Sequence, residues 1–235
     1  MTITRTLLVA ALCSAPVLSM SAQGYAVASS AAKTPAKIPA TSSAKADLLD
    51  RAVTAWSKVK TIRATFDQTI VNPLTGTSQH STGSYLQRRP GKLAVQFDAP
   101  YEDRIVADGT HLWLYLPSSA PGQVIRTRQD ANGAGAMDIS AQFMSAPRKR
   151  YDVTALGAHE GGTTGYRLVP KAGSVVPFKS ATLWIGANAV VKRFEVTELN
   201  GVERTVVLTS YAANAPIAAS AFSYVPPTGV RVVER

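Results

Sequence analysis

This chain of 235 residues has little of the chemistry that enzymes and metal proteins use, with one cysteine and three histidines. The cysteine, Cys13, lies inside the apolar run Leu7–Leu18, so a chain cleaved beyond that run has no thiol and forms no disulfide. His80, His111 and His159 have no second histidine, cysteine or carboxylate at the spacing of metal ligands. We therefore expect no metal site, no bound cofactor and no cysteine chemistry.

Catalytic motifs are also missing. The sequence has no G-x-S-x-G elbow, and no glycine-rich loop follows a strand and opens a helix as nucleotide-binding loops do. The neighbouring carboxylates Glu102 and Asp103 precede Arg104 and are interpreted as a solvated turn rather than an acid/base pair. These absences predict a protein that is not an enzyme, that has no catalytic residue and whose chemistry is the burial of something apolar. An exported hydrolase with a β-fold is the unrelated alternative.

The first 28 residues have the features of a cleavable signal peptide. Arg5 supplies the positive start, and the apolar run that follows is too short to span a bilayer. The small residues Ala26-Val27-Ala28 form the expected cleavage site. Leu12 precedes Cys13, where a lipid-attachment site requires a small residue. The chain is therefore expected to be exported without a lipid anchor.

Acidic residues are few, at 15 against 25 basic residues, and the chain carries a net charge of +10. The basic residues are scattered, and no aromatic platform is interleaved with a basic groove, so we expect no nucleic-acid partner. An acidic protein or lipid surface remains open as a partner, and so does a surface that is basic for solubility alone.

Residues 29–45 consist mainly of Ala, Ser, Thr, Pro and Lys. Such a segment cannot bury enough apolar surface to offset the entropy of ordering, so it is interpreted as a flexible tether. The predicted organisation is a signal peptide (1–28), a tether (29–45) and one domain (46–235) that is mainly β with some helix.

Hydrophobic periodicity predicts one long helix and about eleven strands. Leu49, Val53 and Trp56 fall on one stripe of the helix Asp47–Val59. A second, short helix is expected at Asp138–Ser145, capped by Asp138. The Asp-Gly and Asn-Gly pairs at 108–109 and 200–201 predict tight hairpin turns. The expected strands are Ile62–Val71, His80–Arg89, Lys92–Asp98, Arg104–Ala107, His111–Leu116, Gln123–Thr127, Arg150–Leu156, Gly165–Pro170, Ala181–Ile185, Val190–Leu199 and Val202–Tyr211.

The strand His111–Leu116 is apolar or aromatic on both faces, whereas a strand with one wet face should alternate. One face should therefore meet a core and the other face something else. Sequential antiparallel strands of this number curl into a barrel or half-barrel. We expect it to enclose a ligand cavity, because side chains alone would have to fill an unusually thick interior. Because a bulge can change the face that points inward, the candidate residues either line this cavity or pack against each other. These candidates are Phe66, Leu93, Val95, Phe97, Trp113 and Trp184.

Four segments in order resemble a known family, the periplasmic lipoprotein carrier proteins of Gram-negative bacteria (LolA). They are an amphipathic helix before Ala64–Gln68 (ATFDQ), then Gly83–Pro90 (GSYLQRRP), Ile105–Pro117 (IVADGTHLWLYLP) and Phe222–Val232 (FSYVPPTGVRV). The resemblance spans residues 46–235. It implies an incomplete antiparallel β-barrel of about eleven strands, with a helical lid over an apolar cavity.

The resemblance also implies roles for single residues. Arg89 matches the family arginine that hydrogen-bonds the lid and holds it closed. Leu93 matches an apolar, usually aromatic, position that bears on transfer to a partner, and Val95 matches another aromatic position on the cavity side; both are smaller here. The residues expected in the lid helices are Leu49, Val53, Trp56, Ile139, Phe143 and Met144.

The function implied by the resemblance is that of a periplasmic carrier, acting as a monomer, for acylated lipoproteins. Such a carrier takes its cargo from an inner-membrane lipoprotein-releasing ABC transporter complex and passes it to an outer-membrane lipoprotein receptor. The alternative is a carrier or sensor of another amphiphilic lipid with the same fold.

Overall fold

The computed structural model describes residues 47–129 and 139–235. Within them, twelve strands form one sheet in the order β12-β6-β5-β4-β3-β2-β1-β11-β10-β9-β8-β7. Neighbouring strands are antiparallel except β12 and β6, which are parallel. The strands are β1 (Thr61–Asn72), β2 (Thr77–Arg88), β3 (Lys92–Phe97), β4 (Arg104–Asp108), β5 (His111–Tyr115), β6 (Gln123–Arg128), β7 (Tyr151–His159), β8 (Thr163–Pro170), β9 (Phe178–Gly186), β10 (Val191–Glu198), β11 (Glu203–Ala213) and β12 (Arg231–Glu234).

The eleven strands expected from the sequence are all present, with ends that shift by a few residues. Their order confirms an open, mainly antiparallel sheet built largely from hairpins. The twelfth strand, β12, was not expected, because four residues after Pro226-Pro227 carry too short a pattern to be recognised. It closes no barrel, since β12 and β7 are the two edges of the sheet.

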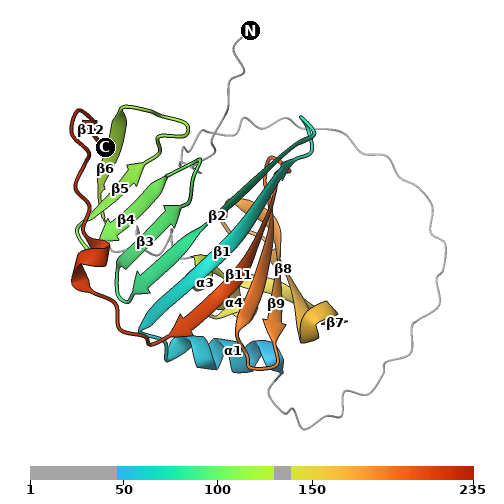
Figure 1. Ribbon diagram of the computed structural model, residues 1–235. Helices are drawn as coiled ribbons and strands as arrows, with labels where there is room; N and C mark the ends of the chain where they lie inside the picture. Colours follow the sequence, from blue (N-terminus) through green and yellow to red (C-terminus); the bar gives the residue numbers. More distant parts are fainter. Residues whose placement is uncertain (1–46, 130–138) are drawn as a thin grey trace, which may run out of the picture.

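The helices are short. They are α1 (Leu48–Ser57), α3 (Ile139–Met144), α4 (Pro147–Arg150) and the 3₁₀ turns η1 (Glu160–Gly162) and η2 (Ala219–Phe222). The first two confirm the two predicted helices, although the proposed cap Asp138 lies outside the described residues. Figure 1 shows α1 lying along one end of the twisted sheet. No helix in the described ranges is long and apolar enough to cross a membrane.

Strand alternation gives the sheet two distinct faces. We call the face that carries Phe66 the helix face, because α1 and α3 pack on it. Along β1, Ile62, Ala64, Phe66 and Gln68 are buried on this face, and the residues between them point the other way. The opposite face is called the strap face, because the C-terminal strap (residues 214–235) crosses it over β3–β6.

On the helix face, α1 and α3 bury the half of the sheet that runs from β7 to β10. Leu49 of α1 and Phe143 of α3 are almost completely buried against Leu183 and Phe194 of the sheet. Each such side chain contributes about 1.5–3 kcal/mol when it leaves water. This apolar cluster fixes where the two helices lie.

On the strap face, the strap supplies the cover. Tyr224 lies 5.6 Å from the ring of Trp113 and 6.2 Å from that of Tyr115, measured between ring centroids. Val106, Trp113 and Val124 are buried beneath it. The two apolar faces expected for His111–Leu116 are therefore present, and on this face part of the chain itself provides the cover.

Gly83 of β2 shows how closely the neighbouring strands β1 and β3 crowd this strand on the helix face. A Cβ atom at Gly83 would lie 2.3 Å from the backbone oxygen of Gln96 and 2.7 Å from the ring of Phe66. Backbone cannot yield as a flexible side chain does, so this position requires glycine. We predict that Gly83→Ala lowers the free energy of unfolding by about 3 kcal/mol, the upper end of overpacking costs.

Urea unfolding followed by circular dichroism measures this change. The neighbouring Ser84→Ala is the control, with an expected effect of less than about 0.5 kcal/mol. Equal stability of the two variants would show that the strands relax around the added methyl group.

Candidate functional site

The candidate site is the helix face together with α1, and it begins at the N-terminus of that helix. The carboxylate of Asp47 accepts the N–H of Asp50 at 2.9 Å and caps the helix. Arg148, in α4, forms ion pairs with both Asp47 and Asp50. Burial alone would raise the pKa of Asp47, but the Asp50 N–H and the Arg148 guanidinium outweigh it and lower the pKa. An arginine thus ties the first turn of α1 to α4.

A second arginine holds the other end of α1. One terminal nitrogen of Arg89, Nη1, donates to the carbonyls of Trp56 at 2.9 Å and Val59 at 3.1 Å. The guanidinium also stacks on the indole of Trp56, 3.7 Å from the ring centroid. A cation there complements the negative end of the helix dipole and satisfies carbonyls that lack a partner within the helix. The contact that the resemblance assigns to Arg89 is present, and its role as a latch remains a prediction.

Only some of the hydrogen-bond donors of Arg89 have partners. Its Nε and Nη2 atoms are buried and have no hydrogen-bond partner in the described part of the chain. Unpaired buried donors cost free energy, so Arg89 holds α1 less firmly than a fully satisfied arginine would hold it. An attachment of this kind can be released at moderate cost.

The predicted lid residues lie together where the structure describes them. Leu49 is fully buried, and Val53 and Trp56 pack around the same cluster as Phe143 and Met144. Ile139 begins α3, but its side chain lies outside the described residues.

Four of the six predicted cavity residues share the helix face. Register places Phe66 opposite Gly83 and Gly83 opposite Phe97, and the two phenylalanine rings meet edge to face at 5.4 Å. Leu93 is buried, whereas Val95 and Phe97 are half-buried. These residues form an apolar wall on β1 and β3, which meets across Gly83 of the intervening strand β2.

The other two, Trp113 and Trp184, lie on the opposite face, so the structure does not bring them to this wall. Trp113 lies beneath the strap and donates its indole N–H to Asp108 at 3.0 Å. Trp184 packs over Gly165 and stacks with His159 at 4.2 Å between ring centroids. Successive side chains of a strand point to opposite faces of the sheet. Each tryptophan lies one residue away from a leucine that points to the helix face, so the tryptophan points to the strap face.

Comparison with known proteins identifies a family. The family model described as outer membrane lipoprotein carrier protein LolA matches residues 57–225. This chain belongs to the LolA family. Outer-membrane lipoprotein carrier proteins of Methylibium petroleiphilum and Proteus mirabilis are 28% and 30% identical to it. The first alignment covers 83% of this chain and 93% of the relative, and the second covers 75% and 83%.

Solved structures give a more distant likeness. A LolA superfamily protein from Nitrosomonas europaea is 12% identical, with a TM-score of 0.39, over 75% of this chain and 96% of that one. The Mycobacterium tuberculosis lipoprotein LppX is 13% identical, with a TM-score of 0.40, over 73% and 97%.

This LolA chain carries one feature of the site that the sequence did not reveal. Gln68 is buried on the helix face, donates to Ser81 at 3.2 Å and accepts from Arg204 at 2.9 Å. Arg204 also pairs with Glu198 at 3.2 Å. The one sequence signal for this network is the polar Gln68 within an otherwise apolar alternation. The other members of the network lie on three other strands, so no local pattern joins them to Gln68. The network ends the apolar wall toward the turn between β1 and β2.

The geometry of Arg89 leads to a testable prediction for α1. Arg89→Leu removes two hydrogen bonds from a charged donor, each contributing about 1.5–3 kcal/mol, so α1 should detach at least about tenfold more often. Trypsin cleavage after the exposed Lys58 and Lys60 reports detachment, and we expect it to accelerate in the variant.

Arg89→Lys is the matched comparison, because lysine keeps the charge and loses the planar fork and the stacking on Trp56. Its cleavage rate should fall between those of the natural chain and Arg89→Leu. If both variants are cleaved at the natural rate, Arg89 does not hold α1.

Proposed function

We propose that this chain is a periplasmic carrier that binds the acyl chains of lipoproteins released from the inner membrane and delivers them to an outer-membrane receptor. Membership of a family of lipoprotein carriers supports this proposal. The predicted signal peptide supports a periplasmic location. An inner-membrane lipoprotein-releasing ABC transporter complex would supply the cargo, and the carrier would act as a monomer.

One observation carries the proposal: the apolar wall of the helix face extends beyond the part that α1 and α3 cover. The helices bury the half of the sheet near β7–β10. On the other half, Val95, Phe97 and Ile105 share the helix face and stay half-buried. An acyl chain lying along this wall would cover the exposed apolar surface and could continue beneath α1 once that helix moves.

Two energies bear on uptake. Each buried CH₂ contributes about 0.8 kcal/mol, so one sixteen-carbon chain gains roughly 12 kcal/mol. Releasing Arg89 from two carbonyls costs about 1.5–3 kcal/mol per hydrogen bond. Opening α1 also uncovers Leu49 and Ala52, and an acyl chain beneath the moved helix would bury the sheet in their place.

Acyl dependence tests the proposal. Native mass spectrometry of the mature protein with an acylated lipoprotein should give a one-to-one complex, and the same lipoprotein without its acyl chains should give none. Val95→Glu places a charge on the wall and should weaken the complex by about tenfold or more.

Val207→Glu is the control, because Val207 is exposed on the strap face, opposite the wall. Equal binding of acylated and unacylated protein would refute the carrier proposal. Binding of a free amphiphilic lipid without lipoprotein binding would favour the alternative cargo.

A further inference from the structure

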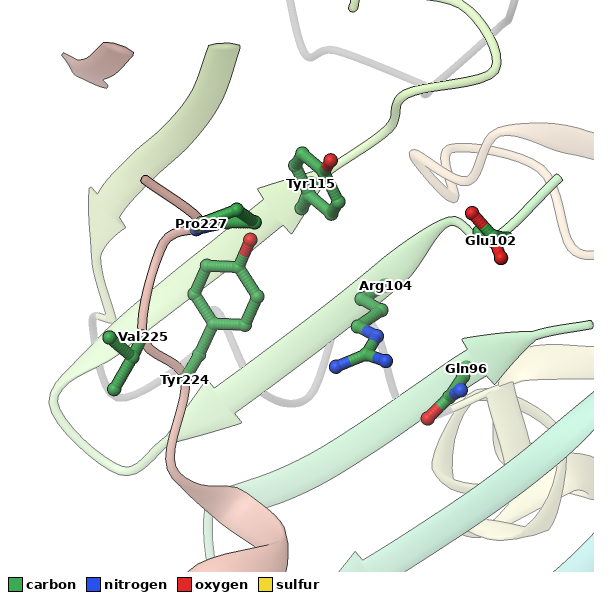
Figure 2. Close-up of a pocket in the computed structure, with 7 residues that line it drawn as sticks. All are labelled: Gln96, Glu102, Arg104, Tyr115, Tyr224, Val225 and Pro227. Carbon is green, nitrogen blue, oxygen red and sulfur yellow. The ribbon is translucent and has the colours of Figure 1, made fainter. Parts of the chain in front are cut away.

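A small pocket lies on the strap face, separated by the sheet from the apolar wall. It has a volume of about 210 Å³ and is lined by three strands, one turn and the strap (Figure 2). The lining residues are Gln96, Glu102, Arg104, Tyr115, Tyr224, Val225 and Pro227. Pockets for drug-sized ligands occupy about 300–1,000 Å³, so this one suits a small group or the end of a larger molecule.

The fold builds the pocket from adjacent positions. Gln96 of β3 pairs with Arg104 of β4, which pairs with Tyr115 of β5, so the three side chains stand in a row on the strap face. Tyr224 approaches this row from the strap and is fixed by its contact with Trp113. Figure 2 shows Arg104 between Glu102 and Tyr224.

The polar groups of this pocket lack partners within the described residues. The guanidinium of Arg104 and the carboxylate of Glu102 have no ion pair, and they do not pair with each other within the 4.0 Å limit of a salt bridge. The hydroxyl of Tyr224 is buried and has no hydrogen-bond partner. By contrast, Arg126 on the same face stacks over Trp113 and pairs with Glu234. Arg104 and Glu102 are exposed, so both charges are open to a ligand, and the buried hydroxyl of Tyr224 is the group that requires an explanation.

Two further features suit a binding site. Glu102 has a φ of 53°, a left-handed conformation that is strained for a residue other than glycine, and such strain gathers at ligand sites. Burial raises the pKa of Tyr224, with the neighbouring Tyr115 adding to the rise and Arg104 opposing it. The hydroxyl of Tyr224 is therefore protonated at neutral pH and can donate.

We propose that this pocket binds a phosphoethanolamine head group. The phosphate would accept from the guanidinium of Arg104 and the hydroxyl of Tyr224, because arginine suits phosphate geometry. The ammonium would pair with Glu102, which lies on the other side of Arg104 from Tyr224. Such a head group has one negative and one positive charge, which match one arginine and one glutamate. In an α-amino acid the two charged groups are bonded to the same carbon, whereas the two-carbon linker of ethanolamine lets its charges reach two separated partners.

Calorimetric titration of the mature protein with glycerophosphoethanolamine tests this assignment. We expect saturable binding that Arg104→Gln and Glu102→Gln each weaken by about tenfold or more. Arg128→Gln is the matched control, since Arg128 is exposed at the far end of β6 and should leave the affinity unchanged. Cosedimentation with phosphatidylethanolamine vesicles, against phosphatidylcholine vesicles, identifies the source of the head group.

Binding to both the soluble compound and the ethanolamine vesicles supports recognition of a membrane lipid. Binding to the soluble compound alone supports the same pocket with a free ligand. No binding in either experiment, or binding that Arg104→Gln leaves unchanged, overturns the proposal. The outcome does not depend on lipoprotein carriage, because the pocket and the apolar wall lie on opposite faces and Arg104→Gln should retain the complex with acylated cargo.

Discussion

An open sheet with two apolar faces is the constraint on which the rest of this structure depends. Alternation places Phe66 on the helix face and Trp113 on the strap face, and neither face can remain in water. Since no second sheet packs against the described residues of the first, short pieces of chain supply the covers. Helices α1 and α3 cover part of one face, and the strap crosses the other. On the remainder of the helix face, Val95, Phe97 and Ile105 stay half-buried, and we propose that this part takes a ligand.

The covers differ in how they are attached. The strap pairs with β6 as a strand and inserts Phe222 and Tyr224 among buried side chains, so it is bound along its length. Helix α1 is held at its ends, by Arg148 at the first turn and Arg89 at the last, and along one side by the burial of Leu49 and Ala52 against the sheet. It pairs with no strand, so it can move as a unit without breaking a strand ladder. We therefore propose that α1, rather than the strap, is the movable element.

Periodicity and turn chemistry predicted the hairpins, α1 and α3, because these signals are local. The faces could not be predicted: Phe66 and Leu93 share one face of the sheet, whereas Trp113 and Trp184, candidates for the same cavity, lie on the other. Their orientation follows from register with distant strands. The network around Gln68 and the pocket at Arg104 join residues far apart in the sequence, so neither had a local signal. Arg89 was identified only through family resemblance, since an arginine after a strand is ordinary.

The central claim is that α1 opens to admit an acyl chain. Hydrogen exchange of the α1 amides, measured by mass spectrometry with and without acylated lipoprotein, tests it most directly. The account predicts faster exchange across Leu48–Ser57 in the acylated complex, unchanged exchange in β1 and β11, and no effect of the unacylated lipoprotein. Unchanged or slower exchange in α1 on formation of the acylated complex would contradict it.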